Sequence, residues 1–284
     1  MNKTQWKCFC EFREDFKEKV NTWKEQFPEL AELQRQAVEK AKAPLYPFET
    51  TVVYNKSLDD ITESDNIKLI VIGDNPGKDE QLIKNNRYLV GQAGKIAEGY
   101  FKRNPDLGVD FRKDVIILNK TPVHSGKTAQ LKTIVKSGGA KIGNLIKESQ
   151  IWMAERTAKL HIDLCKAADI PNNCNNIDYL GAITELWLVG YSELKDKGIF
   201  CYYRDYLGNY YKNNCCSNKD LPEDKVLTEE YWNKVFVFQH FSMNRFSIDL
   251  NNYINNKGLD VGSLSLSEYI HNLGTRHRKE IFGM

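Results

Sequence analysis

The chain has 284 residues, of which 41% are hydrophobic, and its 40 basic and 38 acidic side chains leave a formal net charge of only +2. This composition suits one large or two small domains with a buried core, and no apolar run approaches the roughly 20 residues that cross a bilayer. Bulk charge gives no argument for a nucleic-acid partner, which would need a local basic patch. Because the first residues lack the apolar segment of a secretory signal, we expect a cytoplasmic protein whose seven cysteines stay reduced.

The N-terminal part predicts helices on the flank of a larger domain. Apolar side chains recur at helical spacing between residues 11 and 43, with an interruption at Pro28 and a stop at Pro44. We therefore assign residues 1–48 to N-terminal helices that pack on the core. A weak alternation over residues 46–54 predicts an edge strand.

Four short runs of apolar residues, mostly β-branched or aromatic, predict the strands of a central sheet. They span 68–72, 114–119, 185–190 and 234–240. Long helical patterns separate them, most clearly at about 143–169, and this alternation predicts parallel strands with helices on both faces. The expected fold is therefore α/β, a three-layer sandwich with a central four-stranded parallel sheet flanked by helices.

Two further stretches are additions to this expected core. Residues 201–232 are rich in Tyr, Asn and Cys without a clear period, which predicts an irregular insertion in a domain that spans residues 49–250. Residues 251–284 form an expected C-terminal extension, which is helical in pattern from about 266 to 281.

Polar side chains follow three of the four predicted strands. Asp74 and Asn75 come after the first strand, Asn119 ends the second and His240 ends the fourth. In open parallel sheets, ligands bind outside the carboxyl ends of the strands. The sequence therefore predicts a site that brings these side chains together, although an ordinary Asn-Pro-Gly turn is an alternative for the stretch around Asn75.

Lysine is concentrated just after the second strand. No Asp or Glu occurs from Val115 to Lys147, a stretch with six lysines: Lys120, Lys127, Lys132, Lys136, Lys141 and Lys147. Such a segment could face phosphates, and a solvated helix face is the alternative. A phosphate loop of the nucleotide-triphosphatase type is excluded, because Thr121 stands where the pattern ending in Gly126-Lys-Thr requires glycine.

Three motifs in this order resemble those of the uracil-DNA glycosylase superfamily. They are Gly73-Asp-Asn-Pro-Gly77, the strand Val-Ile-Ile-Leu that ends in Asn119, and His240-Phe-Ser-Met-Asn-Arg245. The family carries G-x-[DN]-P-[YG], an Asn-terminated apolar strand and His-Pro-Ser. The likeness spans roughly residues 66–250.

A fourth segment, Tyr88-Leu-Val-Gly-Gln-Ala-Gly94, is similar to the Phe-Val-Gly-x-Ala-Gly segment of the bacterial and archaeal iron–sulfur subgroup. That subgroup has a C-x2-C near its start and a further cysteine soon after the second strand. This chain has Cys8-Phe-Cys10 and then no cysteine before Cys165, so we expect no cluster of that type. Leu89 stands at the position of the family's stacking Phe, which leaves Tyr88 as the nearby aromatic residue.

The resemblance implies three catalytic side chains. His240 would donate a hydrogen bond to O2 of the departing pyrimidine, where negative charge collects. Asn75 would orient the attacking water, and Asp74 would place negative charge near the cationic sugar. We expect no metal and no organic cofactor.

The resemblance also implies how the base and the DNA are held. Asn119 would read the base edge through its amide, and the rest of the base pocket would come from Gly73, Pro76, Gly77, Tyr88 and Leu89. Ser242 would bind a phosphate, and the loop after it would wedge into the duplex. The wedge would be Met243 or Arg245, on either side of Asn244. Among the lysines, Lys120, Lys127 and Lys132 are the expected phosphate contacts.

The expected function is hydrolysis of the N-glycosidic bond of uracil or a related damaged pyrimidine in single- or double-stranded DNA, by a monomer without a membrane partner. One alternative is a superfamily member that binds DNA or a nucleobase without cleaving it. Another is a small-molecule α/β hydrolase or transferase that uses Asp74 and Asp79.

Overall fold

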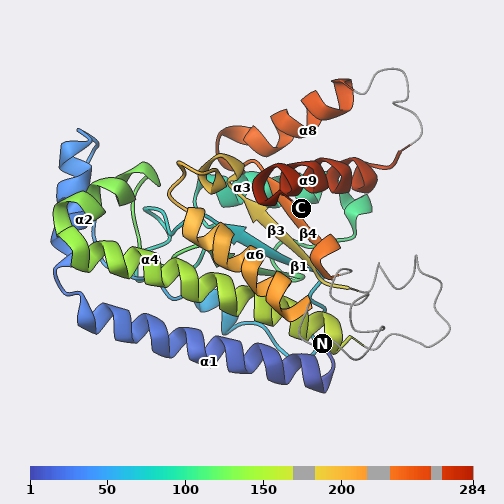
Figure 1. The fold of residues 1–284 in the computed structure, drawn as a ribbon, viewed down its shortest axis with the longest axis horizontal. Helices are drawn as coiled ribbons and strands as arrows, with labels where there is room; N and C mark the ends of the chain where they lie inside the picture. The colour runs from blue at the N-terminus through green and yellow to red at the C-terminus, as the bar shows by residue number, and fades with distance from the viewer. Residues whose placement is uncertain (169–182, 216–230, 257–263, 284) are drawn as a thin grey trace.

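A computed structural model describes residues 1–168, 183–215, 231–256 and 264–283 of the chain. Its centre is a sheet of four parallel strands in the order β2-β1-β3-β4 (Figure 1). The strands are β1 (Leu69–Gly73), β2 (Val115–Asn119), β3 (Glu185–Val189) and β4 (Val235–Phe238). They match the four predicted runs, and the parallel order confirms the predicted fold class.

Helices cover both faces of this sheet. They are α1 (Lys3–Gln26), α2 (Leu30–Lys40), α3 (Gln92–Arg103), α4 (Ala129–Lys166), α6 (Cys201–Cys215), α8 (Arg245–Asn256) and α9 (Leu266–Phe282). Short 3-10 turns are η1 (Lys56–Leu58), η2 (Pro105–Leu107), η3 (Tyr191–Leu194) and η4 (Ser242–Asn244). Within the described ranges, no helix is long and apolar enough to cross a membrane.

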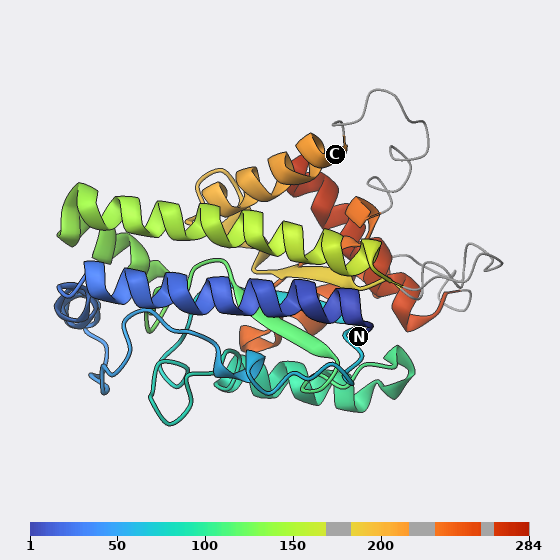
Figure 2. The same cartoon turned by 90° about the horizontal axis from the view of Figure 1, so that it is seen from below.

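Figure 2 shows α1 and α4 on one side of the sheet and α3 on the other. The α3 side is built around Trp187 of β3, whose ring lies 5.6 Å from that of Phe101 in α3 and 6.0 Å from that of Phe246 in α8. On β4, α9 packs closely because Gly274 has no side chain: an added Cβ would lie 2.6 Å from the Phe238 ring. Three layers therefore bury nearly every strand residue.

The N-terminal helices form as predicted. A capping box between Asn2 and Gln5 starts α1, and Phe16 and Val20 are among the side chains that it buries. The helical segment is interrupted near Pro28, between α1 and α2, and α2 ends before Pro44. The long α4 changes direction at Gly139, whose φ of 66° only glycine adopts without strain.

Two predictions of local structure are wrong. Residues 46–54 form no strand apart from one antiparallel bridge of Val52 to Val123, because the Gln81 side chain instead accepts the backbone N–H groups of Glu49 and Thr50. Residues 201–215 form the helix α6 rather than an irregular insertion.

Tyrosines on both faces of α6 obscured its period. Tyr203 and Tyr211 are buried, whereas Tyr202 and Tyr206 are exposed by 41% and 37%. The remainder of the predicted insertion lies largely outside the described residues. The predicted helix at about 266–281 is confirmed as α9.

Candidate functional site

An open cleft of about 380 Å³ lies at the carboxyl ends of β1, β3 and β4. Its walls come from the loops that follow β1 and β2, from η3 and from η4. Eight residues that the sequence singled out line it: Asp74, Asn75, Gly77, Lys127, His240, Ser242, Met243 and Arg245. The strand order therefore brings together side chains that are up to 171 positions apart in the chain, counting from Asp74 to Arg245.

The half-buried His240 is held in one tautomer by Ser242. The backbone N–H of Ser242 donates to Nδ1 of His240 at 3.0 Å, and the Ser242 hydroxyl lies 2.8 Å from the same atom. Because Nδ1 accepts, the neutral ring carries its proton on Nε2. Burial lowers the pKa of His240, Asp74 raises it, and Lys120 and Arg245 lower it, with a net downward shift. His240 is thus a neutral N–H donor in the wall of the cleft.

Asn75 has its amide fixed by the loop after β2. Its Nδ2 donates to Oγ of Ser125 at 2.9 Å and to the carbonyl of Pro76 at 3.1 Å. Among the described residues, no donor reaches Oδ1 of Asn75. The amide oxygen is therefore available to accept a hydrogen bond from water or ligand in the cleft.

A buried histidine of the loop after β2 supports the loop after β1. His124 is fully buried, with Nδ1 2.8 Å from the Pro76 carbonyl and Nε2 2.9 Å from the Tyr46 hydroxyl. Burial lowers the pKa of His124 to about 4, against the weaker opposing effect of the carbonyl contacts. The neutral ring donates from Nδ1 to Pro76 and accepts from Tyr46. This residue was not predicted from the sequence.

Lys120 is buried and does not fit the prediction that it binds DNA phosphate. Its side chain is 0% exposed, and Nζ lies 2.6 Å from Oδ1 of Asp74, 2.5 Å from the Val189 carbonyl and 3.3 Å from the Gly73 carbonyl. Nζ also lies 5.1 Å from the centre of the Phe200 ring. Burial lowers the pKa of Lys120, and the neighbouring Asp74 carboxylate opposes this shift.

The parallel register explains the ion pair. Gly73 lies opposite Asn119 across β1 and β2, so the next residues along the two strands, Asp74 and Lys120, also meet. Gly190, at the end of β3, completes the contact. Its φ is 102°, and an added Cβ would lie 2.3 Å from Oδ1 of Asp74.

Asn119 lies beneath the cleft rather than in its wall. Its side chain is 2% exposed and lies against Gly73, where an added Cβ would be 2.4 Å from Oδ1. Nδ2 of Asn119 is buried and has no hydrogen-bond partner among the described residues. An unpaired buried donor costs about 1–3 kcal/mol, so it calls for a structural or functional explanation.

Tyr88 and Leu89 do not reach the cleft, contrary to the prediction that they line a base pocket. Tyr88 is 1% exposed, and its hydroxyl donates to the Val53 carbonyl at 2.5 Å. Leu89 is 4% exposed and has a left-handed backbone with φ of 50°. Gly94 is needed beside it, since an added Cβ would lie 1.5 Å from the Leu89 carbonyl oxygen. The segment is a packing motif in this structure.

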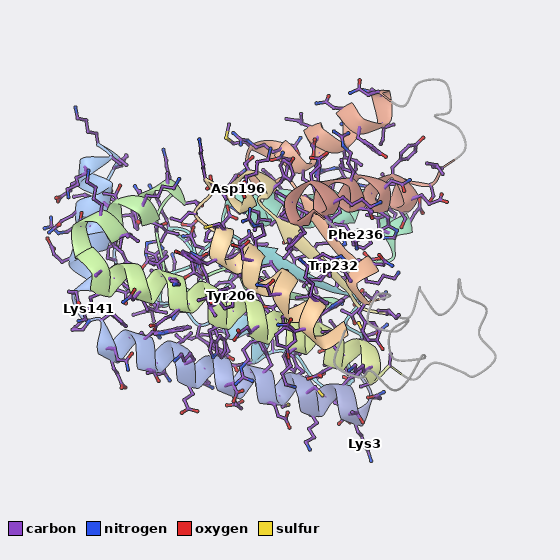
Figure 3. All side chains as sticks on the ribbon, viewed as in Figure 1. Lys3, Lys141, Asp196, Tyr206, Trp232 and Phe236 are labelled. Atoms are coloured by element: carbon purple, nitrogen blue, oxygen red, sulfur yellow. The ribbon has the colours of Figure 1, made fainter. Side chains whose placement is uncertain are left out.

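The remaining lysines occupy different surroundings. Lys127 lines the cleft, and exposed Lys132 lies at the beginning of α4, with Nζ 3.3 Å from the Lys197 carbonyl. Lys141 pairs with Glu29 at 2.6 Å, next to α2, and Figure 3 places it well away from Asp196 in the loop after η3. Only the first part of the lysine segment therefore borders the cleft.

Within the described part of the chain, no group of three or more His, Cys, Asp or Glu side chains is arranged to hold a metal ion. Comparison of the chain with protein-family models, with curated proteins and with solved structures gave no match. The chemistry of the cleft is therefore the basis for assigning a function.

Proposed function

We propose that this protein is a DNA glycosylase of the uracil-DNA glycosylase type, which hydrolyses the N-glycosidic bond of uracil or a related damaged pyrimidine. The observation that carries the proposal is a single cleft with two complementary groups in its wall. One is the Nε2–H donor of neutral His240, and the other is the Asn75 amide, whose oxygen is left available.

Each group meets one need of the reaction. A departing pyrimidine gathers negative charge on O2, so a preplaced donor binds the transition state more tightly than the ground state. The sugar becomes cationic and must meet a water, which the Asn75 oxygen can orient. As an amide, Asn75 cannot take a proton at neutral pH, and we therefore expect a slower reaction than a carboxylate would give. Asp74 adds a carboxylate to the same wall, with Oδ2 3.5 Å from the Thr128 hydroxyl.

The unpaired amide of Asn119 supports a role in reading the base. A pyrimidine O4 would satisfy its Nδ2 donor, and its Oδ1 would accept from N3–H of uracil. In the present structure Asn119 is covered, so the proposal requires the wall between Asn119 and the cleft to open when a base enters.

The rim of the cleft supports a DNA partner. Lys127 and Arg245 both line it and are exposed, and Lys132 lies nearby on α4. Met243 is 74% exposed in the η4 turn, where an apolar side chain could enter the base stack left by an extruded nucleotide. Ser242, beside it, is the proposed phosphate contact.

A small-molecule hydrolase that uses Asp74 and Asp79 is less well supported. Asp74 already pairs with Lys120, and Asp79 is exposed and is not among the residues that line the cleft. The two carboxylates therefore do not form a pair that could share acid and base roles.

Single-turnover excision on uracil-containing oligonucleotides, single-stranded and duplex, tests the proposal. The wild-type protein should produce abasic sites, and His240→Ala should lower the rate by about 10²–10³ because a transition-state donor is lost. His271→Ala is the matched control, since this histidine pairs with Glu185 at the other end of β3. DNA binding without abasic product from any pyrimidine lesion would instead identify a binding protein, and an active wild type unaffected by His240→Ala would refute the assigned role.

A further inference from the structure

A buried ammonium group that the proposed chemistry does not use lies behind the cleft wall. Lys120 has no exposed surface, yet it extends between the ends of β1, β2 and β3. Three acceptors surround its Nζ: the carboxylate of Asp74 and the carbonyls of Gly73 and Val189. An ammonium group has three N–H donors, so this one is fully used.

This saturation limits what Lys120 can do. It has no free donor for a DNA phosphate, and it has no exposed lone pair for attack on a sugar. Its ion pair is with Asp74, which lines the cleft, so Lys120 acts on the cleft by holding this carboxylate and through its own charge. Gly190 holds the other side of this carboxylate, where a Cβ would lie 2.3 Å from Oδ1.

Asp74 and His240 line the same cleft. The charged groups that act on His240 are Asp74 after β1, Lys120 after β2 and Arg245 at the start of α8. Lys127 and Glu193 line the same cleft. Burial has the largest influence and favours the neutral ring, the Asp74 carboxylate alone would favour an imidazolium, and the Lys120 ammonium opposes the effect of Asp74.

We propose that Lys120 is a positioning residue: its ammonium group holds Asp74 against Gly190 and offsets the charge of Asp74 toward His240, which together with the burial of the ring keeps His240 a neutral donor. The use of that donor in catalysis rests on the proposed function, whereas the electrostatic arrangement does not. A fixed protonation state would keep the donor constant across neutral pH.

Titration of the histidines by NMR on the full chain tests this without DNA. The protein has five histidines, and His240→Gln identifies the signal. We expect the pKa of His240 to rise in Lys120→Met and to fall in Asp74→Asn, which keeps an acceptor for Lys120. The pKa of His240 should be higher in the double variant Asp74→Asn/Lys120→Met than in Asp74→Asn. An unchanged His240 titration in folded Lys120→Met would overturn the proposal.

Lys120→Met alone leaves a buried carboxylate without its partner and could unfold the protein. The comparison of Asp74→Asn with the double variant then decides, because the double variant leaves neither charge buried. Equal His240 titration in those two proteins would overturn the proposal. If the wild type excises uracil, the pH profile of single-turnover excision in Lys120→Met should move to higher pH with the His240 titration. If the wild type does not excise uracil, the glycosylase proposal fails, but the titration still tests the role of Lys120.

Discussion

Protonation of His124 should make the cleft loop and the whole domain less stable in acid. The unfolded histidine has an ordinary pKa of 6.5, whereas burial lowers the pKa in the folded protein to about 4. Between these values the unfolded chain binds more protons, so the free energy of unfolding falls as the pH drops below 6.5 and levels off below about 4. This difference corresponds to about 3 kcal/mol, which is a large part of a typical domain stability of about 5–15 kcal/mol.

Urea denaturation at a series of pH values between 7.5 and 4 measures this effect, for the wild type and for His124→Gln. Glutamine cannot take up the proton, so the stability difference between the two proteins should shrink by about 3 kcal/mol as the pH falls. His161, which is also fully buried and has a pKa of about 4, stays in both proteins and cancels in the comparison. Parallel stability curves for the two proteins would refute the assignment of this loss to His124.

Three further predictions follow from the cleft. Gly190→Ala should destabilise the fold by at least about 1–2 kcal/mol, because Gly190 has a φ of 102° and an added Cβ would meet the Asp74 carboxylate. Urea denaturation measures this, and an unchanged midpoint would contradict it. The double variant Lys127→Glu/Lys132→Glu should weaken duplex binding and reduce its salt dependence, whereas Lys141→Glu, beside α2, should not. If fluorescence anisotropy gives the double variant the same affinity for duplex DNA as the wild type, this rim is not the interface. Asn119→Asp should abolish uracil excision by replacing the amide donor with an acceptor, and retained single-turnover activity would show that Asn119 does not read the base.

The sheet was predictable because its strands have a strong local signal. Runs such as Leu69–Gly73 are apolar on both faces, which only a strand covered by two helical layers requires. The polar side chains at the strand ends were predictable because they directly follow these runs, and Asp74, Asn75 and His240 do line one cleft. No local period shows in α6, since tyrosines lie on its buried and its exposed faces.

The parts that were not predicted depend on contacts between distant segments. Whether Lys120 is exposed or buried depends on β2 lying next to β1 in a register that sets it opposite Asp74. Tyr88 is placed in the core by Asn55, whose Oδ1 accepts the Tyr88 backbone N–H at 3.1 Å, and by the left-handed backbone of Leu89. These positions follow from strand order and turn geometry, which residue type and spacing do not specify.

The all-parallel sheet also has a consequence for how the protein acquires its cleft. Because neighbouring strands are parallel, no pair of them is joined by a tight hairpin, and the pairings bring Leu69 next to Val115 and to Glu185. Such pairings between remote residues give a high contact order and slow folding. The cleft draws on the ends of strands from both halves of the chain, so no contiguous fragment that lacks β1 or β4 contains it. During synthesis, the cleft can form only after the segment through Arg245 has emerged and β4 has docked beside β3.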